Sequence, residues 1–314
     1  MKKLSLIVPC YNEAAVLPMF YKETSAVITR LEDAFDVEYV FVDDGSKDDT
    51  LSTLISLAER DVRVKYISFS RNFGKEAAML AGMEYAVRSD YVGIMDADLQ
   101  HSPELIPVML KAVHVDGYDV AAARRDDREG EAKLKSGLSN AFYKVINKIS
   151  ETKISDSAQD FRIMRRNVVQ SIISMPESIR FSKGIFSWVG FNVKWISHEN
   201  RERAAGETKW SIRKLAKYAL DGILGFTTSP LRISLVFSCL FALTAFGSLL
   251  YALIKNGCTP SYQPLLPFIL AAVFFIGAVI LLTIGIAGEY LGRVYTEVKG
   301  RPKYIISQSN ITEF

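Results

Sequence analysis

Short apolar runs alternate with longer amphipathic stretches through the first 125 residues. The runs that predict buried strands are Leu4–Val8, Tyr39–Val42, Val64–Phe69, Tyr91–Met95 and Tyr118–Ala122. The stretches between them that predict helices are Glu13–Leu31, Asp49–Arg60, Glu76–Arg88 and Pro103–Val115. This rhythm is typical of βαβ units. The pattern therefore predicts an α/β fold, with a mostly parallel sheet and helices on both faces.

Two long uncharged runs lie near the C-terminus. Residues Ile233–Ile254 carry no charged side chain over 22 positions, and Leu265–Ala287 carry none over 23. Each run is long enough to cross a hydrocarbon core as a helix. The two runs account for a mean hydropathy of +0.13 in a chain that is 49% hydrophobic. They predict two C-terminal transmembrane helices.

The charges around these runs predict their orientation. Lysines and arginines flank the pair on both sides, at Arg213, Lys214, Lys217, Arg232, Arg293, Lys299, Arg301 and Lys303. The linker 255–264 carries a single charge, Lys255. Because short basic flanks stay in the cytoplasm, we expect both termini there and a small hairpin tip outside. The N-terminal residues do not have the pattern of a signal peptide.

Two basic amphipathic segments precede the spans. Ala141–Ile149 could lie in a membrane interface or pack on the N-terminal domain, and Trp210–Phe226 has an apolar face with lysines between. We therefore divide the chain into a cytoplasmic domain (1–209), an interfacial amphipathic segment (210–230), a two-helix transmembrane hairpin (231–292) and a cytoplasmic tail (293–314).

Composition excludes several other classes of protein. A net charge of +3 gives no case for nucleic-acid binding. The three cysteines are far apart and suggest neither a disulfide framework nor a zinc site. The three histidines, His101, His114 and His198, are scattered, so we expect structural or solvated roles for them. No glycine-rich dinucleotide loop or Walker lysine loop is present.

Asp96 and Asp98 stand one residue apart where the fourth predicted strand ends. Ligands of open α/β sheets bind beyond the carboxyl ends of the strands. Mg²⁺ and Mn²⁺ bind carboxylates together with phosphates. The pair predicts a metal–diphosphate site, although two solvated turn aspartates would give the same short pattern.

Three more polar loops follow predicted strands, and all four loops should meet at one edge of the sheet. They are Pro9–Glu13, Asp43–Ser46 and Ser70–Glu76. Tyr11 could stack on a base, and Glu13 or Asp43 could accept hydrogen bonds from a base or a ribose. Lys75 or Arg71 could neutralise phosphate.

Several motifs together resemble the signature blocks of family 2 glycosyltransferases. They are Val8–Glu13, Asp43–Ser46, Asn72–Glu76, Asp96–Gln100, Gln159–Met164, Arg203–Trp210 and Gly288–Arg293. The order of the blocks and the two spans are most similar to the polyprenyl-phosphate glycosyltransferases. This group includes dolichyl-phosphate mannose synthases and bactoprenol glucosyltransferases. The resemblance covers essentially the whole chain and implies a GT-A catalytic domain that binds a nucleotide sugar.

The resemblance also implies roles for individual residues. Donor contacts are implied for Pro9, Tyr11, Glu13, Asp43, Asp44, Lys75, Asp96, Ala97 and Arg124, the last with Arg125 as the alternative. A divalent cation, Mg²⁺ or Mn²⁺, would be held by Asp96, Asp98 and Gln100. Asp98, Asp160 and Arg203 would be catalytic, and Asp160 would orient either the sugar or the metal. Lys133, Lys135 and Ser136 lie where the family binds the lipid phosphate.

The implied reaction is transfer of one hexose, with inversion, from UDP-glucose to undecaprenyl phosphate in the bacterial inner membrane. The product would be a lipid-linked sugar for cell-surface polysaccharide. UDP-N-acetylglucosamine, GDP-mannose or an aminoarabinose nucleotide remain alternative donors. The implied partners are a flippase and further copies of this chain.

Two other functions share part of this pattern. A processive polysaccharide synthase shares the paired aspartates, but it needs a translocation channel and usually carries a Gln-x-x-Arg-Trp block, which this chain lacks. A membrane scaffold without activity would be expected to lose acidic residues, whereas Asp96, Asp98 and Asp160 are all present.

Overall fold

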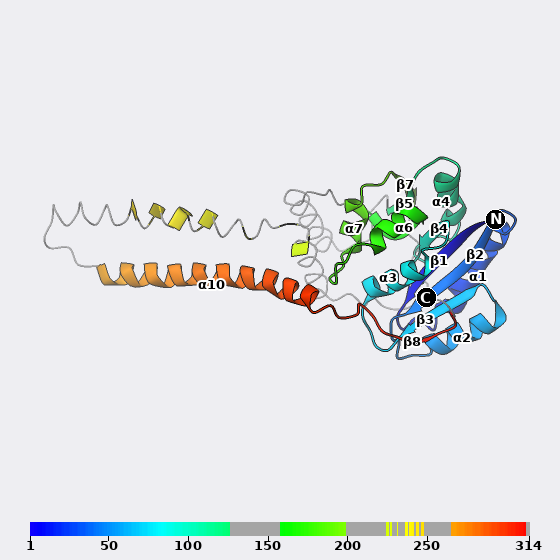
Figure 1. The fold of residues 1–314 in the computed structure, drawn as a ribbon, viewed down its shortest axis with the longest axis horizontal. Coiled ribbons are helices and arrows are strands. Elements are labelled where there is room, and N and C mark those ends of the chain that lie inside the picture. The colour runs from blue at the N-terminus through cyan, green and yellow to red at the C-terminus, as the bar shows by residue number, and fades with distance from the viewer. Residues whose placement is uncertain are drawn as a thin grey trace. The chain divides into compact units, whose positions relative to one another are not determined.

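The computed structural model describes residues 1–125, 158–198 and 265–311, together with part of 224–247 (Figure 1). In chain order the elements are β1 (Lys2–Cys10), α1 (Leu17–Ile28), η1 (Thr29–Leu31), β2 (Phe35–Asp43), α2 (Thr50–Arg60), β3 (Val64–Phe69), α3 (Lys75–Ala86), β4 (Tyr91–Ile94), α4 (Leu105–His114), β5 (Val120–Arg125), β6 (Ala158–Arg165), α6 (Arg166–Ile173), α7 (Ser182–Trp188), β7 (Val193–His198), α10 (Leu265–Val298) and β8 (Ile306–Ser309).

The strands form one mixed sheet in the order β7-β5-β6-β4-β1-β2-β3-β8. The β4-β1-β2-β3 block is parallel throughout, and β7 is parallel to β5. β6 runs antiparallel between β4 and β5, and β8 runs antiparallel to β3. From β1 the chain builds outward through β2 and β3 and then returns to place β4 on the other side of β1. The carboxyl ends of β1 and β4 therefore flank a topological switch point, where ligands of such sheets bind.

Helices cover both faces of the sheet, as the pattern predicts. On β1, Leu4, Leu6 and Val8 belong to an apolar cluster that takes in residues of α1, α2 and α4. Ile7 points the opposite way because side chains alternate along a strand. On that face α3 packs closely enough that a Cβ at Gly82 would lie 2.4 Å from Ile7. The predicted α/β architecture is confirmed.

The first five strands and four helices lie where the apolar pattern predicts them, with shifts at the ends. β1 and β2 extend beyond the predicted runs, β5 starts at Val120 instead of Tyr118, and α1 starts at Leu17 instead of Glu13. Strands β6, β7 and β8 and helices α6 and α7 were not predicted. β8, with the sequence Ile-Ser-Gln-Ser, has no apolar run to reveal it.

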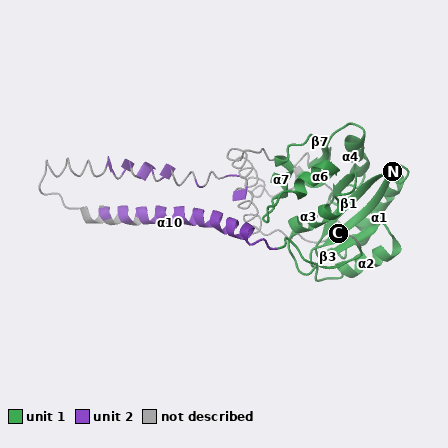
Figure 2. Cartoon of the chain, in the orientation of Figure 1, with its two compact units in different colours: residues 1–148, 152–222, 302–314 green, residues 149–151, 223–301 purple. Residues whose placement is uncertain are grey.

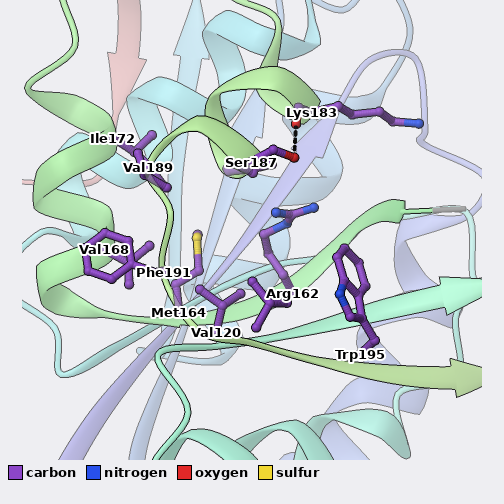
Figure 3. A pocket seen from close by; sticks show the side chains of 12 residues that line it. Val120, Arg162, Met164, Val168, Ile172, Lys183, Ser187, Val189, Phe191 and Trp195 are labelled. Carbon is purple, nitrogen blue, oxygen red and sulfur yellow. Dashed lines mark hydrogen bonds between the residues drawn. The ribbon is translucent and has the colours of Figure 1, made fainter. Parts of the chain in front are cut away.

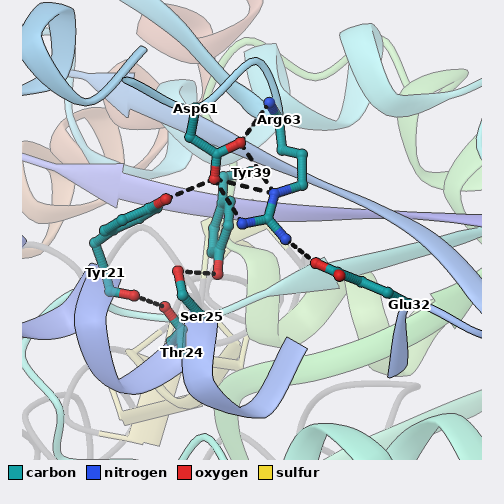
Figure 4. A network of polar contacts seen from close by, with 7 residues as sticks. All are labelled: Tyr21, Thr24, Ser25, Glu32, Tyr39, Asp61 and Arg63. Carbon is teal, nitrogen blue, oxygen red and sulfur yellow. Dashed lines mark hydrogen bonds and ion pairs between the residues drawn. The ribbon is translucent and has the colours of Figure 1, made fainter. Parts of the chain in front are cut away.

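A polar network joins α1, Glu32 just after η1, β2 and the turn before β3 (Figure 4). The Arg63 guanidinium donates to Asp61 at 2.7 Å and pairs with Glu32, and Tyr21 donates to Asp61 at 2.5 Å. Burial opposes ionisation of Asp61, but these donors hold its pKa at about 2. Tyr39 lies behind them and shares a hydrogen bond with Ser25. This network stabilises the fold.

The chain divides into two compact units (Figure 2). The first contains the sheet and its helices, including the C-terminal strand β8, which the sequence had assigned to a tail. The second contains α10 and the described residues from 224 to 247.

Among the described residues one stretch is long and apolar enough to cross a membrane, Phe275–Val298 of α10. Helix α10 begins at the predicted Leu265 and continues beyond the predicted end at Ala287. The first predicted span, Ile233–Ile254, and the interfacial segment 210–230 lie largely outside the described residues.

Candidate active site

The strand register brings the predicted loops together. Cys10 pairs with Asp43 and Asp43 with Ser68, so β1, β2 and β3 end at the same level. Ile7 pairs with Ile94, so the segment Met95–Gln100 leaves the sheet beside the loop that follows β1. The four polar loops therefore gather at the switch point.

The loops after β1 and β2 are tied to one another. The Asn12 amide donates to Ser46 Oγ at 2.9 Å, and the Lys47 amide donates to Asn12 Oδ1 at 2.8 Å. Asn12 adopts a left-handed conformation, with φ of 52°. Tyr11 and Glu13 stand half-buried on this loop, and Pro9 lies at the end of β1. Hydrogen bonds from backbone amides to side chains thus fix the loop that carries the predicted nucleoside contacts.

Asp43 and Asp44 both point into the protein. Asp43 is 1% exposed, and its two oxygens accept from the Ser46 amide at 3.0 Å and from Ser68 Oγ at 2.7 Å. Asp44 accepts from the amides of Phe73 at 2.6 Å and Gly74 at 2.9 Å, which anchors the loop before α3. Burial raises the pKa of Asp44 to about 6, although these amides favour its charged form.

Gly45 is required where these loops cross. Its φ is +65°, and a Cβ there would lie 2.3 Å from the backbone carbon of Arg71. A side chain at this position would be strained and would push the loops apart.

Lys75, the first residue of α3, joins two carboxylates. Its ammonium lies 2.7 Å from Asp96 Oδ1 and 2.6 Å from Asp160 Oδ2. Burial alone would lower the pKa of Lys75, but the charges of Asp160 and Asp96 outweigh it and raise that pKa. Burial likewise opposes ionisation of Asp160, yet Lys75, then Lys183, hold its pKa well below its ordinary value. Lys75 and Asp160 therefore both keep their charges at neutral pH.

The paired aspartates stand on a tight turn. Ala97 and Leu99 are buried, Leu99 has a φ of 57°, and the Gln100 amide donates to Asp98 Oδ1 at 3.1 Å. Asp96 and Asp98 are half-buried between these apolar positions. Both carboxylates are therefore partly accessible, whereas the apolar residues between and after them anchor the turn in the core.

These residues fit a hard divalent cation that also binds substrate. In the described part of the chain, no group of three or more His, Cys, Asp or Glu side chains comes together as a self-sufficient metal cage. Mg²⁺, however, is commonly held by one or two carboxylates plus substrate phosphates and water. The ammonium of Lys75 already sits against Asp96 as a cation, so the site is built to hold positive charge.

His101 and His198, far apart in sequence, form a buried pair behind the turn. Their Nδ1 and Nε2 atoms are 3.0 Å apart, and His198 Nδ1 lies 3.2 Å from the carbonyl oxygen of Arg124. Because a carbonyl oxygen only accepts, His198 donates to it from Nδ1. The pair fastens the ends of β5 and β7 to the aspartate turn, which agrees with the structural role expected for both histidines.

Other candidate residues lie apart from this cluster or cannot be placed. The side chain of Arg124 is exposed at the end of β5, and that of Arg125 is not described. Arg71 is exposed and stacks on Phe73, with 4.0 Å from its guanidinium to the ring centroid. Arg203, Lys133, Lys135 and Ser136 lie outside the described residues.

Two cations beside Asp160 were missed by the sequence reasoning. Arg162 is 4% exposed, and Lys183 lies on α7. The spacing Asp160-Phe161-Arg162 could have revealed the first, because residues two apart on a strand share a face. Nothing local in sequence pairs Lys183 with Asp160.

Comparisons with known proteins identify the family of this chain. Residues 5–173 match the model of glycosyl transferase family 2, and residues 229–294 match that of the GtrB C-terminal hairpin. A glucosyl-3-phosphoglycerate synthase structure from Mycobacterium tuberculosis is 16% identical, with a TM-score of 0.49, and the match covers 71% of this chain and 78% of that one. That likeness is too distant to bear on substrates.

Curated relatives match along nearly their whole length. The prophage bactoprenol glucosyl transferase homolog of Escherichia coli K12 is 41% identical over 98% of this chain and 99% of its own. The bactoprenol glucosyl transferase of Shigella phage SfII is 41% identical over 98% of each chain. Identity of this extent, together with the family model over more than half of the residues, shows that the chain belongs to glycosyl transferase family 2 and is a glycosyltransferase.

Proposed function

We propose that the protein transfers a single hexose from a nucleotide sugar to a polyprenyl phosphate, with UDP-glucose and undecaprenyl phosphate as the favoured pair. One observation carries the proposal: the Lys75 ammonium forms ion pairs with both Asp96 and Asp160 at the switch point of the sheet. It puts acidic and basic groups where a diphosphate and a sugar would meet. The relatives named bactoprenol glucosyl transferase support the choice of acceptor and of glucose.

The donor is assigned to the loops after β1, β2 and β4. Pro9, Tyr11, Glu13 and Asp43 would recognise the nucleoside, and Asp43 would act partly by holding the loop, since both of its oxygens already accept hydrogen bonds. Asp96, Asp98 and Gln100 would hold a divalent cation, which when bound stabilises the charge that develops on the leaving diphosphate. Lys75 and Arg203 would add positive charge beside that group.

The phosphate group of the acceptor lipid supplies the nucleophilic oxygen. A phosphate monoester has a second pKa near 6 and is largely ionised at neutral pH, so its oxygen can attack the anomeric carbon without a strong base. Asp160 keeps its charge because its pKa is lowered, and we assign it to orienting the sugar. The protein's main contribution would be to hold two anionic substrates within reach of each other. Attack opposite the leaving group inverts the anomeric carbon.

The setting is the cytoplasmic face of a bacterial inner membrane. One described apolar stretch, Phe275–Val298, supports membrane attachment. We propose that Ile233–Ile254 forms a second span, that residues 210–230 lie in the interface, and that both termini are cytoplasmic. A homo-oligomer and a flippase that receives the product complete the proposal.

A donor panel tests the reaction. The purified full chain is incubated with undecaprenyl phosphate, Mg²⁺ or Mn²⁺ and each of four radiolabelled donors: UDP-glucose, UDP-N-acetylglucosamine, GDP-mannose and an aminoarabinose nucleotide. We expect label in the lipid phase from UDP-glucose alone, and none from the Asp98→Asn variant. Transfer from another donor would overturn the sugar assignment, and absence of lipid product from every donor would overturn the function.

A further inference from the structure

Glu76 lies on the first turn of α3, directly after Lys75. Its two carboxylate oxygens accept from the Ser182 amide at 3.2 and 3.1 Å, and the Ser182 hydroxyl donates to Oε2. Ser182 is 3% exposed and is the first residue of α7. Because the first amides of a helix have no partner within it, Glu76 joins the start of α7 to the start of α3.

The residue after Ser182 is Lys183, a half-buried cation whose charge acts on Asp160. Burial opposes ionisation of Asp160, but the charge of Lys75, followed by that of Lys183, keeps its pKa well below its ordinary value. The hydrogen bonds between Glu76 and Ser182 therefore fix the stretch of backbone from which Lys183 reaches toward Asp160.

Three contacts connect α3, β6 and α7 in a closed circuit. The Lys75 ammonium joins α3 to Asp160 of β6 at 2.6 Å. The Arg162 guanidinium of β6 lies 3.6 Å from the centroid of the Phe186 ring on α7. Glu76 completes the circuit, because it joins α7 back to α3. The position of α7 relative to the Asp160 carboxylate thus depends on all three contacts.

Apolar packing alone leaves room beside α7. A pocket of about 190 Å³ lies between α7 and the sheet, and Figure 3 shows Arg162 of β6 and Lys183 and Ser187 of α7 in its lining. Protein interiors otherwise contain few voids larger than a water molecule. Helix α7 has only seven residues, and so short a helix is not stable by itself. Polar contacts such as that of Glu76 are therefore needed to hold α7 in one place.

We propose that Glu76 is a positioning residue for sugar transfer. By binding Ser182 it holds α7 so that the charge of Lys183 faces Asp160, which keeps the Asp160 carboxylate in the orientation that receives the sugar. Glu76 acts through α7 and does not touch the substrate. This inference rests on the proposed function and deepens it, because it adds a residue that determines the placement of the donor's sugar and not of its nucleoside.

A kinetic comparison tests this role. We expect Glu76→Ala to lower kcat with UDP-glucose about tenfold, because the reacting groups are misplaced, and to leave the Kd for UDP, which lacks the sugar, unchanged. Glu76→Gln keeps an acceptor for Ser182 and should retain most of the kcat. Glu84→Ala is the matched control, because Glu84 is half-buried on the same helix and accepts from the Tyr304 hydroxyl. It should lower the melting temperature without lowering kcat.

A double-mutant cycle tests whether Glu76 acts through Lys183. Lys183→Met keeps the apolar stem and removes the ammonium. If the two residues act as one unit, the double variant should lose no more kcat than Lys183→Met alone, since coupled residues are not additive. Losses that multiply in the double variant, or a wild-type kcat in a Glu76→Ala protein of lowered melting temperature, would overturn the positioning role.

Chemical modification tests the geometry without relying on activity. The full chain in detergent, as wild type, Glu76→Ala, the milder Ser182→Ala and Glu84→Ala, is treated with an acetyl N-hydroxysuccinimide ester, and acetylated lysines are mapped by mass spectrometry. We expect Lys183 to react severalfold faster in Glu76→Ala and Ser182→Ala than in the other two proteins, with the exposed Lys194 as internal reference. Equal rates at Lys183 in all four would overturn the positioning role. Absence of transfer by the wild type, beside the expected acetylation pattern, would instead overturn the proposed function.

Discussion

At the scale of single residues, Lys75 is the most informative position. The sequence identified it as a candidate phosphate ligand from its motif. Its pairing with Asp160 across 85 positions could not be predicted, because it depends on β6 inserting beside β4. Asp96 was predicted from its place after a strand, and the local pattern sufficed there.

Replacing Lys75 by Gln should leave Asp96 and Asp160 facing each other without a cation. The three side chains are partly exposed, so we expect the free energy of unfolding to fall by about 2 kcal/mol. This lies between the values typical of surface ion pairs and of fully buried ones. Mg²⁺ should then raise the melting temperature of Lys75→Gln more than that of the wild type, because a bound cation replaces the ammonium. Differential scanning fluorimetry measures this, with the exposed Lys22→Gln as control. An equal response to Mg²⁺ in all three proteins would count against the cation-holding role.

The raised pKa of Asp44 predicts a pH dependence of stability. Its folded-state pKa of about 6 exceeds the ordinary value of 3.8, so the folded protein binds the proton more tightly. The contribution to stability is therefore complete below about pH 4 and is lost as the pH rises through 6. This contribution to the free energy of unfolding is on the order of 3 kcal/mol, since each pKa unit is worth about 1.4.

Asp44→Asn keeps an acceptor for the Phe73 and Gly74 amides but cannot titrate. We expect the difference in melting temperature between wild type and Asp44→Asn to change across pH 4–6 and to stay constant above 7. Parallel curves for the two proteins over the whole range would show that Asp44 has an ordinary pKa.

At the scale of elements, prediction succeeded where strands are apolar and failed where they are not. Each of β1 to β5 contains a continuous apolar run. β6 carries Asp160 and Arg162 among its apolar residues, and β8 has two serines and a glutamine in four positions. Such strands are specified by their neighbours, which a local pattern does not contain.

The C-terminal strand is held by side chains as well as by its ladder. The Tyr304 ring stacks on Phe69 with centroids 5.0 Å apart, and its hydroxyl donates to Glu84 of α3. Asn310 extends the pairing, because its side chain accepts from the Tyr66 amide at 2.8 Å and donates to the Val64 carbonyl at 3.0 Å. The end of the chain thus covers the β3 edge and braces the helix that begins at Lys75.

Tyr304→Ala should destabilise the first unit by about 2 kcal/mol, through loss of the ring contact and of the hydroxyl bond. Tyr304→Phe keeps the ring and should cost about 1 kcal/mol. Chemical denaturation followed by intrinsic tryptophan fluorescence gives both values. If Tyr304→Ala were no less stable than Tyr304→Phe, the ring stacking would not contribute to holding β8.

At the scale of the whole molecule, hydropathy and charge predict a hairpin in the membrane. The structure supports one apolar helix, since most of the first span lies outside the described residues. The orientation follows from basic flanks alone, which is a property of the chain in a membrane and not of its packing.

The native cysteines offer a direct test of this topology. Cys258 lies in the predicted tip, whereas Cys10 is buried at the end of β1. A membrane-impermeant maleimide should therefore label the protein in intact spheroplasts, and Cys258→Ser should abolish that labelling. Labelling that requires lysis would place the tip in the cytoplasm and contradict the predicted orientation.

The proposed reaction of this chain forms a bond between a hexose and a lipid phosphate. The most direct measurement is the mass spectrum of the lipid extract after the purified protein, undecaprenyl phosphate, Mg²⁺ and UDP-glucose are incubated together. We predict a lipid heavier by one hexose residue, its yield reduced about 100-fold or more in Asp98→Asn because a charge-stabilising group is lost. An unmodified lipid beside intact UDP-glucose, from protein that is folded and membrane-bound, would contradict the account.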